Sequence, residues 1–539
     1  MFLLIAMVSM AISMAIIPLM MRYASRLGML DNPDPRKVHA VPIPRVGGVG
    51  IVIGALVAML IWLPSTPFVN SFIFGCVVLL IFGVWDDCKE LGHYVKFIGQ
   101  FIAVIVVVYY GDLYVAHFPY MGLETLPESI GKPFTVIALV GVINALNHSD
   151  GLDGLAGGES LLSFGAVAYL AYLYDGLFVM VIACAMIGGI FGFLRFNSHP
   201  ARVFMGDGGS QVLGFSLGVV VVLLTQEVNP VMSSALPLLL IGLPIIDILA
   251  VFFLRAKGGM NLFRATKNHI HHRLLELGFY HYESVMVIYS IQAFFVFCAI
   301  LLRYESDFLI TAVYLLASAA VFAALTIAER RGSHFYRNNL LDQKSKILSR
   351  ILSGKLVLAI SMQVLQAGVS IFLVGAALTS VEVPQDIAVS AVLLLVILIM
   401  LVLVPPLANL FLFRLVAFVS IGFAVYLSTS YPPVWLSNQH YLVLVFFAVL
   451  LVAGFLAVRM SSETSFQITP LDYLVVIIAV IISIVSEGRG GSELTWMALQ
   501  MIALFYASEL ILQRVKSMRN RVSGALIAML SLVAARGLL

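Results

Sequence analysis

Long apolar stretches constrain the fold of this chain more than any other feature. A helix that spans a bilayer takes about 20 largely apolar residues, and only 11% of the chain is charged, against about 25% in a soluble domain. We therefore predict an all-α polytopic integral membrane protein. About eleven apolar runs precede residue 330, namely 2–20, 47–64, 68–85, 96–110, 133–146, 160–174, 177–194, 211–226, 235–254, 285–302 and 308–328.

A polar segment divides the apolar runs into two groups. It covers residues 331–355, between a first module at 1–330 and a C-terminal module at 356–539. About six or seven further helices are expected in the C-terminal module, whose role the sequence does not indicate. The candidate runs there are 356–378, 386–404, 409–428, 441–458, 472–486, 495–512 and 521–537.

The basic residues predict how the first module is oriented. The run at 2–20 has no basic segment before it and no small-residue cleavage site, so we interpret it as a retained helix and not a signal peptide. With the N-terminus outside, the outer loops carry only Lys132 and Arg303. Lysines and arginines concentrate in cytoplasmic loops, and the inner loops would hold Arg22, Arg26, Arg36, Lys37, Arg45, Lys89, Lys96, Arg195, Arg202, Arg255, Lys257, Arg264, Lys267 and Arg273.

Charge and cysteine content exclude two classes of function. A net charge of +3 is too small to indicate a nucleic-acid partner. The four cysteines have no paired spacing, so neither a disulfide framework nor a zinc site is expected.

Five polar islands interrupt the first module, and the predicted topology puts all of them on the cytoplasmic side. We expect them to build one site there, because independent loops would not all fall on the same face. They are DNPDPRKVHAVPIPRVGG (31–48), DDCKELGHYVKFIGQ (86–100), NALNHSDGLDGLAGG (144–158), NSHPARVFMGDGGS (197–210) and NLFRATKNHIHHRL (261–274).

The island at 144–158 places Asn144, Asn147, Asp150 and Asp153 three residues apart. On a helix this spacing forms a continuous polar band, and ionisable residues at membrane depth are functional candidates. A helix cap followed by a solvated loop is the plainer alternative. An EF-hand is excluded, because the alternating oxygen ligands and the closing glutamate are missing.

Three further acids predict acid–base and metal chemistry. Asp86 and Asp87 are adjacent, so one is expected to hold a proton and act as a base, unless both are simply solvated. Asp207 lies in a glycine-rich turn. Carboxylates of this kind suit Mg²⁺, or Mn²⁺ in its place, which shares its remaining ligands with substrate phosphates.

Basic and histidine side chains form the remaining candidates. His269, His271 and His272 could bind a transition metal, but neighbouring cations favour contact with phosphate. Arg36, Lys37, His39 and Arg45 either hold an anionic group or only anchor the topology. Carboxylates, glycine-rich turns and cations on one membrane face together indicate phosphoryl transfer to a lipid phosphate.

These motifs resemble the polyprenyl-phosphate N-acetylhexosamine-1-phosphate transferases, a family that includes the phospho-N-acetylmuramoyl-pentapeptide transferase of peptidoglycan synthesis. The resemblance covers about residues 1–330. It rests on DDCKEL with Lys96 and Gln100 downstream, NALNHSDGLDGLAGG, ARVFMGDGGS and HIHHRL, in that order. HIHHR is more similar to the N-acetylglucosamine branch than to the peptidoglycan branch.

The resemblance implies an activity and a place. A sugar 1-phosphate would pass from a UDP-amino sugar to undecaprenyl phosphate, with Mg²⁺ required and UMP released, to start a lipid-linked glycan such as lipopolysaccharide or a cell-wall polymer. The enzyme would lie in the bacterial inner membrane as a multi-pass protein with its N-terminus outside, its active site facing the cytoplasm and no nucleic-acid partner. It could form a homo-oligomer.

The resemblance also implies residue roles. Asp207 would be the principal Mg²⁺ ligand, with Asp150 and Asp153 shaping the metal site. Asp86, assisted by Asp87, would deprotonate the lipid phosphate or attack covalently. Nucleotide, diphosphate or sugar would be held by Asn144, Asn147, Lys96, His269, His271, His272, Arg273, Arg36, Lys37, His39 and Arg45.

One departure from the family leaves the sugar open. Pro-Asp-Arg often precedes the histidines in the family, whereas this chain has Ala265-Thr266-Lys267, and a lysine lacks the bidentate fork of an arginine. N-acetylglucosamine, N-acetylgalactosamine and N-acetylfucosamine are all compatible. The alternatives to an enzyme are a membrane transporter, which the loop position of the polar residues disfavours, and a scaffold without transferase activity.

Overall fold

The computed structural model describes residues 2–33, 41–89, 91–121, 125–259, 268–332, 354–403, 410–433, 435, 440–459, 477, 491–514 and 516–538. About four-fifths of them are helical and only four lie in the two named strands, which confirms the predicted all-α membrane fold. Within these ranges, nine helices are long and apolar enough to cross a bilayer. The helices fall into two compact units, α1 to α13 in the first and α15 to α22 in the second.

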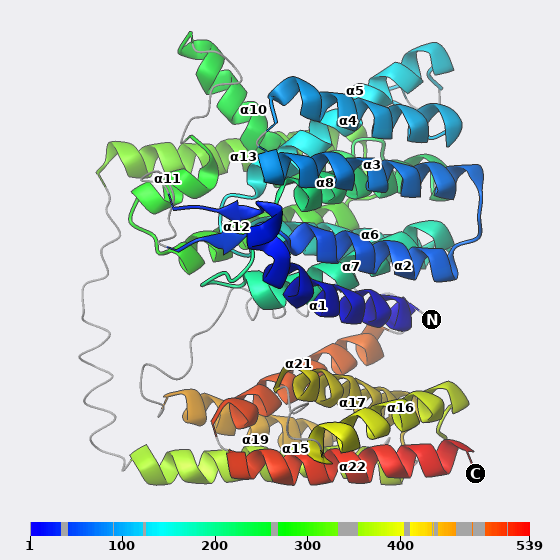
Figure 1. Cartoon of the computed structure of the whole chain (residues 1–539), viewed down its shortest axis with the longest axis vertical. Helices are drawn as coiled ribbons and strands as arrows, with labels where there is room; N and C mark the ends of the chain where they lie inside the picture. Colours follow the sequence, from blue (N-terminus) through cyan, green and yellow to red (C-terminus); the bar gives the residue numbers. More distant parts are fainter. Residues whose placement is uncertain are drawn as a thin grey trace. The chain divides into compact units, whose positions relative to one another are not determined.

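In the first unit, the helices run roughly parallel to one another (Figure 1). Each of the eleven apolar runs predicted there contains one helix or a broken pair. The helices are α1 (Phe2–Leu27), α2 (Gly47–Trp62), α3 (Pro67–Lys89), α4 (His93–Ile105), α5 (Glu128–Ser149), α6 (Leu155–Leu173), α7 (Leu177–Asn197), α8 (Asp207–Leu223), α9 (Pro237–Leu240), α10 (Gly242–Lys257), α11 (Ile270–Glu276), α12 (His281–Leu301) and α13 (Asp307–Arg330).

Short elements complete the first unit. The π-helical segments η1 (Val106–Tyr110) and η2 (Leu224–Val228) extend α4 and α8. Strands β1 (Leu30–Asp31) and β2 (Ile43–Pro44) pair antiparallel. The strands and α11 lie at the same end of the bundle, on the left in Figure 1, so the islands that carry them converge as the sequence predicts.

Helix α8 forms the centre of the first unit, and almost all of its residues are buried. Glycines let its neighbours approach its first turn closely. A Cβ atom added to Gly48 of α2 would lie 2.3 Å from the Cα atom of Gly209, and one added to Gly83 of α3 would lie 2.2 Å from the Cα atom of Gly208. This packing fixes α2 and α3 against the residue that begins α8, Asp207.

The predicted run at 235–254 is broken at Ile241, between α9 and α10. Non-helical backbone at membrane depth needs partners from the protein, and Gln292 of α12 supplies them. Its Nε2 donates to the carbonyl oxygen of Leu240 at 3.1 Å, and its Oε1 accepts the amide of Leu243 at 3.1 Å. The break sets the direction of α10, which projects away from the other helices in Figure 1.

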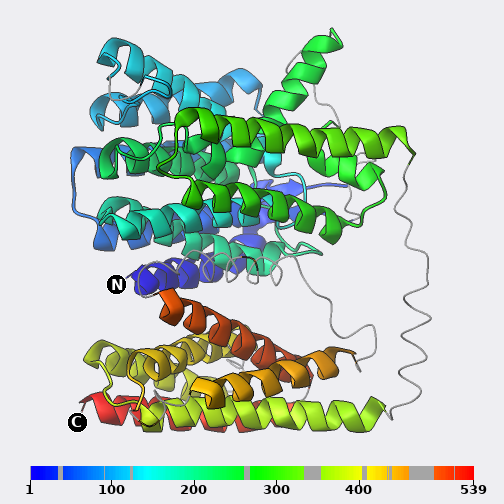
Figure 2. The same ribbon diagram turned by 180° about the vertical axis from the view of Figure 1, so that it is seen from behind.

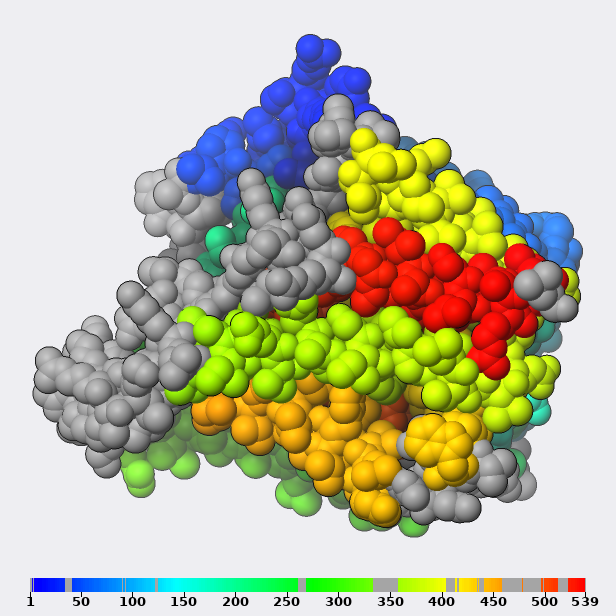
Figure 3. Space-filling model, turned by 90° about the horizontal axis from the view of Figure 1, so that it is seen from below, coloured from blue at the N-terminus to red at the C-terminus, as the bar shows by residue number. Residues whose placement is uncertain are grey.

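The second unit consists of helices that pack through apolar side chains. Its core includes Leu365, Val369, Leu504 and Leu530. Helix α22 packs on α15 and α16, and Figure 3 shows α22, in red, beside α15 in yellow-green. The run predicted at 472–486 lies, apart from residue 477, outside the described residues. The helices are α15 (Gly354–Thr379), α16 (Gln385–Leu403), α17 (Leu410–Ser430), α19 (His440–Arg459), α21 (Gly491–Arg514) and α22 (Lys516–Leu538).

Candidate active site

Three of the predicted acids meet where α3 ends and α8 begins. Asp86 and Asp87 occupy the last turn of α3 and are each only 6% exposed. Asp207 is the first residue of α8, where the positive end of the helix dipole favours a carboxylate. Its amide donates to Oδ1 of Asp87 at 3.2 Å. Gly206 has a φ of +76°, and a Cβ atom there would lie 2.4 Å from Oδ2 of Asp87, so the turn needs a glycine.

Lys96 joins the acids through its ammonium group. Its Nζ atom lies 2.7 Å from Oδ2 of Asp86 and 2.6 Å from Oδ2 of Asp207. Helix α4 brings the lysine there, and the second oxygen of Asp86 accepts the amide of Leu91 at 2.6 Å. Three acidic side chains and one ammonium group therefore share a small volume, in which the acids outnumber the cation.

This donor set fits a divalent metal ion. Hard cations such as Mg²⁺ take carboxylate oxygens, and the ammonium of Lys96 already holds a cationic position between two of them. Asp207 and Asp86 would hold the ion, with Asp87 beside them. The structure thus brings together Asp86, Asp87, Lys96 and Asp207 from separate elements.

The predicted polar band begins on a helix and ends in a loop. Asn144 and Asn147 lie in the last turns of α5, but α5 ends at Ser149, so Asp150 and Asp153 do not continue the helix as the spacing suggests. The backbone of Asp150, with φ −77° and ψ 59°, ends the helix, and Gly154, with φ +81°, precedes the first residue of α6. The four residues of the band therefore do not share one helix face. The two asparagines lie at the end of α5, and the two aspartates lie in the loop that follows it.

The two asparagines connect α5 to the acid cluster. Asn147 donates from Nδ2 to the hydroxyl of Ser210 in α8 at 2.8 Å. Asn144 donates from Nδ2 to Oε1 of Gln100 at 2.8 Å, and Nε2 of Gln100 lies 3.2 Å from Oε1 of Gln211. A carboxamide network thus joins α4, α5 and α8 behind the carboxylates.

The pKa values of the two loop aspartates shift in opposite directions. Burial, and then the charges of Asp207 and Asp153, raise the pKa of Asp150 to about 7. Burial would also raise the pKa of Asp153, but the hydrogen bond from His199 and the nearby His281 lower it below its usual value. Asp150 therefore responds to the acid cluster, whereas Asp153 is held by histidines.

Asp153, His199 and His281 form a second cluster. Oδ2 of Asp153 lies 2.7 Å from Nδ1 of His199 and 3.9 Å from Nε2 of His281. Their ligand atoms are close enough to hold a metal ion. However, Nε2 of His281 accepts the amide of Asp153 at 3.1 Å, so the electron pair that a metal needs there is already used. This arrangement instead fixes the loop between α5 and α6.

The predicted histidines pack against the island at 144–158. The ring of His269 stacks on that of His148 with centroids 5.6 Å apart. The ring of His271 fills the space next to Gly151, where a Cβ atom would lie 2.3 Å from its Nε2, and burial lowers its pKa well below the usual value. His272 lies against His271, with ring centroids 4.2 Å apart. The histidine island therefore adjoins the loop that carries Asp150.

The predicted basic residues separate into different settings. Arg45 forms an ion pair with Asp31, across the β1–β2 pair. Arg273 makes a two-pronged contact with Glu329 of α13, from Nε at 2.7 Å and Nη2 at 2.9 Å, so a phosphate contact for it stays a prediction. Arg36, Lys37 and His39 lie outside the described residues.

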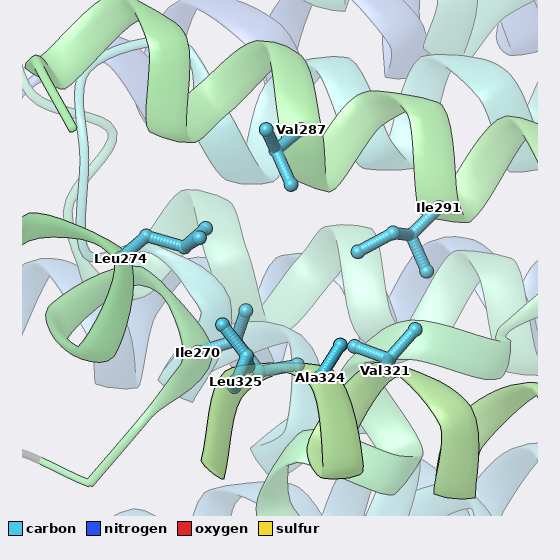
Figure 4. Close-up of a pocket in the computed structure, with 7 residues that line it drawn as sticks. All are labelled: Ile270, Leu274, Val287, Ile291, Val321, Ala324 and Leu325. Carbon is cyan, nitrogen blue, oxygen red and sulfur yellow. The ribbon is translucent and has the colours of Figure 1, made fainter. Parts of the chain in front are cut away.

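An apolar cavity lies behind the histidine helix. Figure 4 shows its lining, in which Ile270 and Leu274 of α11 meet residues of α12 and α13. Figure 2 shows α12 and α13 from behind. The cavity has a volume of about 160 Å³ and no polar lining, so it offers nothing that would bind a nucleotide.

The structure adds site residues that sequence reasoning missed. Asp247 of α10 contacts His269, while Asn197 and Tyr289 bind the backbone of Gly154 at 2.7 Å and 2.6 Å. Asp247 carried a usable signal, since it is an ionisable residue inside an apolar run. Gln100 was quoted in its motif but assigned no role.

Part of the chain is similar in sequence to known proteins. Residues 69–225 match the family described as Glycosyl transferase family 4. The chain is 32% identical over 302 residues to a probable undecaprenyl-phosphate N-acetylglucosaminyl 1-phosphate transferase of Bacillus subtilis, covering 55% of this chain and 83% of that protein. It is 30% identical over 291 residues to the undecaprenyl-phosphate alpha-N-acetylglucosaminyl 1-phosphate transferase of Escherichia coli K12, covering 53% and 79%.

A third relative has a different lipid in its name. The decaprenyl-phosphate N-acetylglucosaminephosphotransferase of Mycobacterium tuberculosis is 30% identical over 357 residues, covering 59% of this chain and 86% of that protein. A large part of this chain lies outside each of these alignments.

Proposed function

We propose that this chain, which belongs to glycosyl transferase family 4, transfers an N-acetylhexosamine 1-phosphate from a UDP-sugar to undecaprenyl phosphate and releases UMP. The observation that carries the proposal is the Asp86–Lys96–Asp207 bridge, which gathers carboxylates and a cation next to the carboxamides of α5. The names of the relatives support the lipid acceptor and the sugar phosphate.

The proposed reaction exchanges one phosphorus–oxygen bond for another. An oxygen of the lipid phosphate attacks the phosphorus atom that bears the sugar, and the bond from that phosphorus to the bridging oxygen of UMP breaks. Asp86 takes the proton of the lipid phosphate if it arrives protonated. Lys96, already between two carboxylates, neutralises charge that develops on the transferring phosphoryl group.

We propose Mg²⁺ as the cofactor, with Mn²⁺ as a substitute. Asp207 and Asp86 would hold it, and Asp150 would stand nearby. When bound, the ion would neutralise the diphosphate of the donor and orient it. Asn144 and Asn147 would then bind the nucleotide through amide groups that the network behind them keeps in place.

We propose N-acetylglucosamine as the donor sugar, because all three relatives carry it in their names. Lys267, which stands where the family often has arginine, lies outside the described residues. N-acetylgalactosamine and N-acetylfucosamine are therefore compared with N-acetylglucosamine in the experiment below.

The proposed location is a bacterial inner membrane, with the N-terminus outside and the active site facing the cytoplasm. The loops and helix ends on the side of the five polar islands carry most of the basic residues of the first module, and the opposite loops carry only Lys132 and Arg303, which supports this orientation. A donor made in the cytoplasm would then reach the site directly.

The decisive experiment measures UMP release from UDP-N-acetylglucosamine, UDP-N-acetylgalactosamine and UDP-N-acetylfucosamine by the purified chain. Undecaprenyl phosphate and Mg²⁺ are each added or omitted. We expect release only when both are present, and fastest from UDP-N-acetylglucosamine. Asp86→Asn is expected to abolish the release.

The control variant is Asp112→Asn. Asp112 is an exposed carboxylate in an ion pair with Lys132, and it adopts a positive φ that asparagine also tolerates. We expect it to keep the wild-type rate. No release from any donor by protein that elutes as a single species would contradict the proposed activity and favour a scaffold without catalysis.

A further inference from the structure

We propose that Asp247 is a positioning residue, which fixes the proton of His269 on Nδ1 and so leaves Nε2 as the nitrogen that meets the donor substrate. The proposal rests on the transferase function proposed above. It assigns a role to the one acidic side chain of α10, which none of the sequence motifs includes.

The geometry shows two contacts from one carboxylate. Oδ2 of Asp247 lies 2.7 Å from Nδ1 of His269, and Oδ1 accepts the amide of Ile270 at 2.9 Å. The side chains of Asp247 and His269 are only 11% and 8% exposed. Both oxygens are thus used within a single turn at the start of α11, away from water.

The chemistry of the groups determines which nitrogen carries the proton. An ionised carboxylate only accepts hydrogen bonds, so the nitrogen 2.7 Å away must be the donor. The hydrogen bond made by one ring nitrogen of a histidine decides the state of the other. With Nδ1–H committed to Asp247, His269 has only Nε2 left for a ligand.

Neighbouring rings hold the imidazole in this orientation. The ring of His269 stacks on His148 at 19° and on His271 at 9°, with centroids 5.6 Å and 5.7 Å apart. Rotation about the side chain would break both stacks and the bond to Asp247. Because His271 in turn packs on Gly151, the direction of Nε2 is coupled to the loop that carries Asp150.

The broken helix explains how an acid reaches this position. Asp247 lies on α10, which begins after the break at Ile241 that Gln292 stabilises. If the predicted run at 235–254 formed one continuous helix, Asp247 would face a different direction. The break therefore brings a carboxylate from within an apolar segment to the histidine island.

The first test is a double-mutant cycle in the full-length chain, with lipid-dependent UMP release as the readout. Asp247→Asn keeps the size of the side chain but replaces one of its two acceptor oxygens with an NH₂ group, which donates hydrogen bonds. We expect kcat/KM to fall about 10–100-fold, as for other partners that orient a functional histidine. In a His269→Gln background, Asp247→Asn should cause no further loss, because there is no imidazole left to orient.

The matched control is Asp307→Asn. Asp307 also holds backbone, since its Oδ2 accepts the amide of Tyr120 at 2.8 Å and its Oδ1 the amide of Ala235 at 3.3 Å, but it contacts no site residue. We expect its kcat/KM to stay within about twofold of wild type. If Asp247→Asn lowers kcat/KM equally with and without His269, it acts by holding α11 in place and the proposal is wrong.

A second test does not need activity. In protein labelled with ¹⁵N on its imidazoles, the resonances that vanish in His269→Gln belong to His269. We expect a proton on Nδ1 in the wild type and on Nε2 in Asp247→Asn. A wild-type His269 without a proton on Nδ1 would overturn the proposal, whereas absent UMP release with the expected resonances would overturn only the proposed function.

Discussion

The two helical units of this chain bury different kinds of polar group. The first unit buries ionisable side chains, among them Asp86, Asp87 and Asp247, and each has a charged or hydrogen-bonding partner. Within the described part of the second unit, the buried polar residues are serines and glutamines, namely Ser361, Gln366, Ser380, Ser420, Gln500, Ser508 and Ser523. Ionisable groups are costly in a membrane protein and mark function. The second unit buries a carboxylate oxygen of Glu509 in α21, whereas the first gathers several acids around Lys96, so the proposed chemistry is assigned to the first unit.

Two glycines, one in each unit, differ in the space around them. Gly48 of α2 leaves no room for a methyl group, because the backbone of Gly209 is in its place. Gly375 of α15, in the second unit, has nothing within 4 Å of an added Cβ atom. Close backbone approach serves the acid cluster, whereas α15 is held by larger side chains such as Leu365 and Leu373.

The largest expected effect is on Asp207. We expect Asp207→Asn to lower lipid-dependent UMP release by about 10³-fold or more, because it removes a charge that would hold the metal ion and that pairs with Lys96. The measurement is a steady-state rate at saturating Mg²⁺. Activity near that of wild type would show that the acid cluster is not the active site, and the chemistry would have to lie elsewhere in the protein.

The next effect compares two glycines. We expect Gly48→Ala to destabilise the protein by about 1–3 kcal/mol through overpacking, and Gly375→Ala to be neutral or to stabilise α15 by up to about 1 kcal/mol. Thermal unfolding in detergent measures both. Equal destabilisation by the two substitutions would show that the units pack alike.

A smaller effect is expected at the end of α22. Arg536 donates to the carbonyl oxygens of Ala377 and Ser380 at 2.6 Å each, which terminates α15 with a cation. We expect Arg536→Gln to cost less than about 1 kcal/mol of stability, since the contact is partly exposed, and to leave UMP release unchanged. A fall in the rate would connect the second unit to catalysis.

The smallest expected effect is on Gln366, a buried polar residue of α15. We expect Gln366→Leu to leave the rate of UMP release within the error of the assay, because an apolar side chain of similar volume is tolerated in a packed core. The same preparation is assayed for thermal stability as a check on folding. A tenfold loss of rate would contradict the assignment of the proposed chemistry to the first unit alone.

Much of the first unit could be predicted from the sequence because membrane helices and sharp motifs leave strong local signals. The apolar runs gave the helices, and the polar islands, which share one end of the bundle, included Asp86, Asp207 and the asparagines. Partner choice could not be predicted in this way. Nothing in the spacing indicates that Lys96 joins Asp86 to Asp207, which is 111 residues away.

The misses have physical causes. Asp247 was hidden in an apolar run, and its role depends on a helix break that Gln292 of α12 stabilises from a distance. The helical spacing of the polar band failed after Ser149, because the backbone of Asp150 leaves the helical conformation, with φ −77° and ψ 59°. The phosphate contact predicted for Arg273 stays a prediction, but its partner Glu329 could not be predicted, because the island does not contain that acid.

The contact of Arg536 also bears on the order in which the protein is made. The carbonyl oxygen of Ala377 gains its guanidinium partner only when Arg536, 159 residues later, has been translated. The end of α15 therefore lacks this contact while α16, α17, α19 and α21 are made. The acid cluster needs only residues up to α8. Synthesis from the N-terminus therefore completes the acid cluster before the second unit begins, whereas α15 gains its contact with Arg536 only after α22 has been made.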